Sequence, residues 1–178
     1  LYHVVSNIAV ALTQTGKKTL LIDGDMRRPS LNREFSQVPR EPGLSNYLAD
    51  LNVTPTNVIH EVPGQEGIRL IPSGPIPPNP GELLASSRLT ALLDELKETY
   101  DFILMDSPPA LPVADASVMA PRADGVLVVV NGQATKAGAL QGAISIIQQA
   151  KTPVLGVVIN KFKRPRFGYG YYYKPYYY

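Results

Sequence analysis

The sequence contains no cysteine and no long hydrophobic run, and each absence excludes a class of protein. Without cysteine the chain forms no disulfide, carries no thiolate nucleophile and offers no cysteine ligand to a metal. This composition is typical of a reducing cytoplasm. No stretch approaches the roughly 18 to 20 apolar residues that a membrane-spanning helix requires, and no signal peptide is visible. We therefore expect that this domain does not itself cross a membrane.

What is present fits one globular domain. The chain has 178 residues, of which 44% are apolar and 18% are charged. Its charge is uneven, because residues 161–178 hold basic residues and no acid, whereas acids outnumber bases elsewhere. The basic residues of this end are Lys161, Lys163, Arg164, Arg166 and Lys174. Such an end could face anionic lipid, an acidic partner or solvent. Because the chain begins at Leu1, directly before a helical pattern, we expect it to be a fragment.

Short apolar runs alternate with helical patterns along the chain. Five runs predict strands, at residues 18–22, 68–72, 102–106, 125–130 and 154–159. The runs at 125–130 and 154–159 are apolar without alternation, as expected for strands covered by helices on both faces. Apolar spacing predicts helices from Val5 to about Gly16, at 43–50 and around 140–147. This order predicts an α/β fold, a parallel sheet with helices on both faces.

The segment NPGE at residues 79–82 has the pattern of a helix start. Asn79 is the expected N-cap, Pro80 the first helical residue, and Glu82 the reciprocal partner of a capping box. The leucines that follow predict the buried face of one helix reaching about Tyr100.

Acidic side chains follow two of the predicted strands. LLIDGD places Asp23 and Asp25 after one strand, and FILMDSPP places Asp106 after another. The carboxyl ends of parallel strands share one edge of a sheet, so these acids should meet, with Asn160 ending a third strand. Carboxylates in this position are typical of Mg²⁺ sites for phosphoryl transfer. Acids that only cap a loop or lie on the surface produce the same sequence pattern. We expect Asp106 to hold the ion's water shell, and Asp23 and Asp25 to help bind it and to orient or deprotonate an attacking hydroxyl.

Phosphate-binding parts are incomplete. Arg27 and Arg28 could bind phosphate or acids of a neighbouring subunit, or remain surface residues. The loop G-x-x-x-x-G-K-[ST], whose backbone and lysine cradle the phosphates of a nucleotide, occurs nowhere in the sequence. The chain alone should therefore bind ATP poorly.

Four segments together resemble those of the bacterial tyrosine kinases, the cytoplasmic partners or domains of polysaccharide co-polymerases that control capsule and exopolysaccharide export. They are LLIDGDMRRP, SGPIPPNPGELLAS, YDFILMDSPP and GVVINKF, followed by a tyrosine cluster. In that family the first matches the Walker A′ segment, and FILMDSPP matches Walker B. The resemblance implies a P-loop fold related to partition and septum-site ATPases. It also implies that a phosphate loop, Walker A, directly precedes VSNIAVAL, so this chain would lack the first strand and the loop.

The resemblance extends to the roles of residues. It implies a kinase that uses ATP and Mg²⁺, with Asp23, Asp25 and Asp106 catalytic and the latter two at the metal. Arg28 is expected at the nucleotide phosphates, and Asn160 matches a position that approaches the adenine, although a strand-end cap explains it equally. The implied phosphate acceptors, modified in trans between neighbouring protomers, are Tyr169, Tyr171, Tyr172, Tyr173, Tyr176, Tyr177 and Tyr178. A tail of tyrosines could instead bind sugar or another protein.

The expected organisation is a truncated kinase domain at 1–163 and a flexible tyrosine-rich tail at 164–178. The implied partners are other copies of the chain in a ring, a transmembrane co-polymerase activator or fused membrane region, and a tyrosine phosphatase, with no nucleic acid. The implied location is the cytoplasmic face of the plasma membrane. Two alternatives remain open: a partition- or septum-site-type ATPase, and a non-catalytic scaffold phosphorylated by another kinase.

Overall fold

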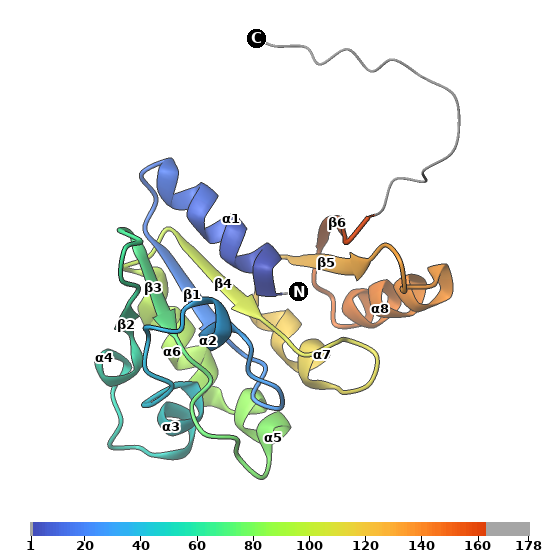
Figure 1. Ribbon diagram of the computed structural model, residues 1–178. Helices are drawn as coiled ribbons and strands as arrows, with labels where there is room; N and C mark the ends of the chain where they lie inside the picture. Colours follow the sequence, from blue (N-terminus) through green and yellow to red (C-terminus); the bar gives the residue numbers. More distant parts are fainter. Residues whose placement is uncertain (1, 163–178) are drawn as a thin grey trace, which may run out of the picture.

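A computed structural model describes residues 2–162 (Figure 1). Its strands are β1 (Thr19–Asp23), β2 (His60–Glu61), β3 (Ile68–Ile71), β4 (Phe102–Asp106), β5 (Val126–Asn131) and β6 (Val154–Asn160). Its α-helices are α1 (Tyr2–Gln14), α2 (Leu31–Glu34), α3 (Leu44–Ala49), α4 (Pro55–Val58), α5 (Pro80–Ala85), α6 (Ser87–Lys97), α7 (Asp115–Met119) and α8 (Ala137–Gln149), and a 3₁₀ turn, η1, spans Ala120–Arg122. The predicted tail and the domain boundary at 163 lie outside these residues.

Strand β1 is central in a four-stranded sheet of order β2-β3-β1-β4. It pairs in parallel with β3 on one side and with β4 on the other, and the short β2 adds an antiparallel edge beside β3. All five residues of β1 are buried. The sheet is therefore parallel at its centre, as predicted, and it carries the strand ends that matter for the site.

Successive side chains of β1 enter different cores, because a strand points alternate residues to opposite faces. Leu20 and Ile22 pack in one core with leucines of α6, whereas Leu21 packs in the other with Ala9 of α1. Figure 1 shows α1 and α6 on opposite sides of these strands. Each fully buried Leu or Ile side chain stabilises the fold by about 1.5–3 kcal/mol. The predicted α/β fold is confirmed, and both faces of this four-stranded sheet are covered as predicted; β5 and β6 differ, because Leu155, Val157 and Ile159 are exposed.

The single helix predicted from residue 79 to about 100 is wrong in one respect, because the chain forms two helices. Ser86 has an extended conformation (ψ 152°), and its hydroxyl donates to the carbonyl of Leu83, ending α5. Serine competes with the helical hydrogen bonds in this way. The predicted capping box is also absent: the Asn79 amide donates to the Glu82 carboxylate (Nδ2–Oε2 2.6 Å), so the two side chains bind each other.

Strands β5 and β6 form a separate parallel pair. The sequence predicted that they would continue the same sheet, and this prediction is wrong within the described residues. Within residues 2–162, β4 and β5 share no ladder, so one edge of each is unpaired. One side of the pair meets α8, where Ile147 is buried. Large apolar side chains of the pair are exposed, with Leu155 at 71%. Such free edges and apolar faces are normally covered in a finished sheet.

Candidate active site

The ends of β1 and β4 bring the predicted acids together. Asp23 and Asp106 are direct partners in the parallel register of these strands. Just beyond, the backbone N–H of Gly24 donates to the Asp106 carbonyl (3.0 Å). The prediction that carboxylates from two separate strands meet at one sheet edge is therefore confirmed.

Glycine at position 24 is required by a close approach. A Cβ there would lie 2.6 Å from the Asp106 carbonyl oxygen and 2.5 Å from Cε of Met119. Only a residue without a side chain lets the chain cross the end of β4 at this distance. Gly24 thus fixes where the loop after β1 starts, and so where Asp25 lies.

Asp23 anchors this loop from below. Its carboxylate is fully buried and accepts three backbone N–H groups: that of Asp25 at Oδ1 (3.2 Å), and those of Ser30 and Leu31 at Oδ2 (both 3.1 Å). Burial raises the pKa of Asp23 to about 6, and the negative charge of Asp106 adds to this, against the lowering effect of the three N–H donors. These three bonds place Asp23 to shape the loop, and the direct contact of Asp23 with a ligand that the sequence predicts stays a prediction.

Asp25 is partly exposed, and its carboxylate can accept more hydrogen bonds than it does. Its Oδ1 accepts the N–H groups of Arg27 (3.2 Å) and Arg28 (2.9 Å), which closes a tight turn. Its Oδ2 accepts no hydrogen bond from any residue that the structure describes. One oxygen of Asp25 is thus available to a cation or a proton.

The carboxylate of Asp106 can also accept further ligands or hydrogen bonds. Its Oδ1 accepts the N–H of Ser107 (3.1 Å), and among the described residues its Oδ2 meets only the Ser30 hydroxyl, at 3.4 Å. Burial raises the pKa of Asp106, and the nearby charge of Asp25 raises it further. A divalent cation between Asp25 and Asp106 would relieve this repulsion.

The donor set fits Mg²⁺ held jointly with phosphate. Among residues 2–162, no group of three or more His, Cys, Asp or Glu side chains is arranged around a metal position. Mg²⁺, however, is usually bound by one or two carboxylates together with waters and substrate phosphates. Asp25 and Asp106 would supply those two carboxylates, because carboxylate oxygens are the hard ligands that Mg²⁺ prefers.

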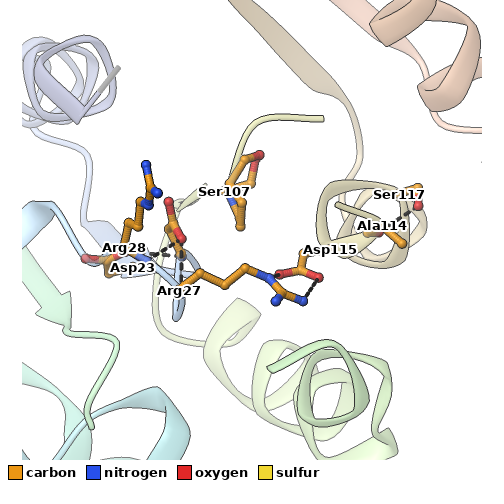
Figure 2. Close-up of polar contacts among 9 residues, drawn as sticks. Asp23, Arg27, Arg28, Ser107, Ala114, Asp115 and Ser117 are labelled. Atoms are coloured by element: carbon orange, nitrogen blue, oxygen red, sulfur yellow. Dashed lines mark hydrogen bonds and ion pairs between the residues drawn. The ribbon is translucent and has the colours of Figure 1, made fainter. Parts of the chain in front are cut away.

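The two neighbouring arginines differ in their partners (Figure 2). Arg27 forms a two-point ion pair with Asp115 of α7, with Nε–Oδ2 at 2.7 Å and Nη2–Oδ1 at 3.0 Å. This carboxylate raises the pKa of Arg27 above its ordinary value. Figure 2 shows the Arg28 side chain pointing away from Asp115, and it bonds to no side chain or carbonyl of the described residues. Sequence reasoning missed Asp115, since nothing in the pattern around it signals burial.

Asn160 lies at the end of β6, in register with Asn131 of β5. Its Oδ1 accepts the N–H of Lys161 (2.8 Å), a bond that shapes the strand end. It belongs to the second strand pair, and no hydrogen bond joins it to the acids of the first. The expected adenine contact of Asn160 stays a prediction, as do the phosphate-accepting tyrosines, which lie outside the described residues.

Comparisons with known proteins agree on the family. A family model described as an AAA domain matches residues 3–155. The tyrosine-protein kinase YwqD of Bacillus subtilis is 34% identical over 94% of this chain and 70% of its own length. EpsB of Ralstonia solanacearum is 38% identical over 94% of this chain, which spans only 22% of that relative.

Solved structures extend the likeness to three dimensions. The kinase domain of the Escherichia coli tyrosine kinase ETK matches with a TM-score of 0.85 and 33% identity, over 96% of this chain and 66% of that one. The chimerical protein CapA2B2 matches with a TM-score of 0.83 and 36% identity, over 90% of this chain and 70% of that one. The septum-site-determining protein MinD of Pyrococcus horikoshii, 22% identical with a TM-score of 0.74 over 93% of this chain and 66% of that one, shares the fold. The chain belongs to the bacterial tyrosine kinase family, built on the P-loop α/β fold.

Proposed function

We propose that the whole protein is an ATP-dependent protein-tyrosine kinase that phosphorylates its own C-terminal tyrosines in trans. One observation carries this proposal: Asp106 and the loop bearing Asp25 meet at one sheet edge. Among the described residues Asp25 Oδ2 accepts no hydrogen bond, and Asp106 Oδ2 accepts only a long one from Ser30 (3.4 Å). Family membership supplies the reaction class. The acceptors are the seven tyrosines between residues 169 and 178.

The roles follow from which oxygens are free. Asp25 and Asp106 hold Mg²⁺, which when bound offsets the charge of the β- and γ-phosphates. Arg28, whose guanidinium is unengaged among the described residues, binds phosphate. Asp23 keeps the loop in place because its carboxylate accepts hydrogen bonds from three backbone N–H groups.

Transfer needs little more than position and charge. The tyrosine oxygen attacks the γ-phosphorus, the bond from that phosphorus to the leaving oxygen of ADP breaks, and the phenol proton passes to the Asp25 carboxylate. Burial raises the pKa of Asp106, and the nearby charge of Asp25 raises it further, so a bound cation would favour the ionised form of Asp106. Asn160 approaches the adenine in this proposal.

A phosphate loop must complete the site. The unpaired edges of β4 and β5 leave room in the sheet for a strand, and YwqD and the other relatives of its size are longer than this chain. We infer that a segment preceding Leu1 in the whole protein adds a strand between β4 and β5 and carries the loop. Cover for the exposed Leu155 would come from the same segment.

The biological setting is also part of the proposal. Copies of the protein assemble in a ring at the cytoplasmic face of the plasma membrane, with a transmembrane co-polymerase activator or a fused membrane region, and a tyrosine phosphatase reverses the reaction. Within residues 2–162 no helix is long and apolar enough to span a bilayer. Each phosphate adds about −1.5 to −2 charges, so the basic end becomes strongly negative. This reversal of charge is the proposed switch for regulating capsule or exopolysaccharide export.

Mass spectrometry of the whole protein tests the kinase proposal. ATP with Mg²⁺ should load phosphate on tyrosines 169–178 of the wild type, and Asp106→Asn should abolish the signal. The matched control is Asp94→Asn, which removes an exposed carboxylate of α6 whose one ion pair within the described part of the chain is with Lys97. ATP hydrolysis without tyrosine phosphate would favour the septum-site-type ATPase. Phosphate that appears only when a second kinase is added would favour the scaffold.

A further inference from the structure

The ion pair between Arg27 and Asp115 joins the two loops that flank the candidate site. Arg27 belongs to the loop after β1, and Asp115 is the first residue of α7, which follows the loop leaving Asp106. The pair is asymmetric in burial: the Asp115 side chain is 2% exposed and the Arg27 side chain 42%. Both nitrogens of the guanidinium fork are used, at 2.7 and 3.0 Å (Figure 2).

This asymmetry fixes Arg27 in place. A carboxylate out of water needs its cation, and within residues 2–162 Arg27 is the sole ion-pair partner of Asp115. If Arg27 turned toward a phosphate, it would leave a buried charge uncompensated. The geometry therefore separates the two arginines: Arg27 is held by Asp115, whereas the side chain of Arg28 has no partner among residues 2–162.

The same pair ties Asp25 to α7. The backbone N–H of Arg27 donates to Asp25 Oδ1 (3.2 Å), while its side chain reaches Asp115. Beside it, Met119 of the same helix packs where a side chain at Gly24 would stand. The loop bearing Asp25 is thus held against α7 at two points, and α7 begins the segment that follows Asp106.

We propose that Arg27 and Asp115 form a positioning latch that sets the spacing of Asp25 and Asp106 for the metal ion and keeps Arg27 away from the phosphates. This inference rests on the proposed function. Neither residue touches the reacting atoms, and both act through Asp25. Supporting contacts of this kind around metal ligands typically change metal affinity or activity by 10–100-fold when removed.

A double-mutant cycle in the whole protein, with its phosphate loop, tests the latch. The proteins are the wild type, Arg27→Lys, Asp115→Asn and the double variant. The readouts are the Mg²⁺ concentration that gives half-maximal tyrosine phosphorylation, the KM for ATP, and hydrogen exchange at the amides of residues 24–31. The control is Glu61→Gln, which removes the exposed partner of another arginine, Arg69, on β3.

The latch predicts a specific pattern. Asp115→Asn should raise the half-saturating Mg²⁺ concentration about tenfold while the KM for ATP changes less than threefold. Arg27→Lys should act in the same direction, and the double variant should match Asp115→Asn alone, because the pair is one unit. Exchange at residues 24–31 should rise in all three variants and not in the control.

Three outcomes overturn the latch. If Asp115→Asn lowers thermal stability but leaves the Mg²⁺ requirement unchanged, the pair is only structural; if the two single effects add, Arg27 acts without Asp115. An inactive wild type would instead refute the proposed function. Hydrogen exchange would then still test the latch, because exchange at residues 24–31 that is the same in the variants as in the wild type refutes the latch by itself. Should Asp115→Asn fail to fold, Arg27→Lys, which keeps the charge, carries the same two readouts.

Discussion

The buried carboxyl of Asp23 predicts an unusual dependence of stability on pH. Its pKa is raised from 3.8 to about 6 in the fold, chiefly by burial. Between these values the folded state binds a proton that the unfolded chain does not. This contribution to stability is fully present below pH 3.8 and is lost as the pH rises through about 6. The metal-free protein should therefore be more stable at pH 5 than at pH 8.

The size of the effect follows from the shift. One pKa unit corresponds to about 1.4 kcal/mol, so the whole shift is worth about 3 kcal/mol. Only about 1.4 kcal/mol of this is regained between pH 8 and pH 5, because at pH 5 the proton is held mainly by the folded state but the titration is incomplete. For a chain of this length, that corresponds to a Tm higher by roughly 3–6 °C at pH 5. The raised pKa of Asp106 acts in the same direction.

Thermal unfolding of the wild type and of Asp23→Asn from pH 5 to pH 8 measures this effect. The variant should have a shallower slope, because its amide does not titrate. It should also be less stable at pH 5 by about 1–3 kcal/mol, since its NH₂ group faces one of the N–H donors that the carboxylate accepts. Equal slopes in the two proteins, or a wild type more stable at pH 8, would refute the account of Asp23. Asp94→Asn, at an exposed site, should change neither quantity.

Three further perturbations have defined outcomes. Gly24→Ala should destabilise the protein by about 1–3 kcal/mol in denaturant unfolding, because the new Cβ meets the Asp106 carbonyl and Met119; a variant as stable as wild type would contradict the packing. Arg88→Ala should lower the Tm by several degrees, because the Arg88 guanidinium lies 4.3 Å from the centre of the Tyr47 ring and donates hydrogen bonds to three backbone carbonyls, those of Tyr47, Asp50 and Val53. An unchanged Tm would mean that these contacts do not stabilise the fold. Leu92→Ala should cost about 2–5 kcal/mol in urea unfolding, and a cost below 1 kcal/mol would show that the site under α6 collapses.

The sheet could be predicted from sequence because its signals are local. Unbroken apolar runs such as residues 20–22 are typical of strands buried on both faces, and parallel strands place their carboxyl ends at one edge. The meeting of Asp23 with Asp106 followed from these two rules alone. The break of the helix at Ser86 was missed because leucines lie on both sides of it and no Gly or Pro occurs between residues 82 and 97.

The separate roles of the charged residues could not be predicted, because these roles depend on contacts between segments that are far apart in the sequence. Whether Asp23 faces a ligand or the backbone is decided by the path of residues 24–31, which no spacing rule gives. Arg27 and Asp115 are 88 residues apart, and neither looks different from a surface residue in the sequence. The separation of β5 from β4 likewise depends on which strands are available to pair.

The central claim is that Asp25 and Asp106 share one nucleotide-bound divalent ion. It is tested most directly by crystals of the whole protein grown with Mn²⁺ and a non-hydrolysable ATP analogue, in which anomalous scattering locates the ion. The account predicts a single peak beside the γ-phosphate, within about 2–5 Å of a carboxylate oxygen of both residues, directly or through one coordinated water. A peak bound to the phosphates but remote from either carboxylate would contradict it.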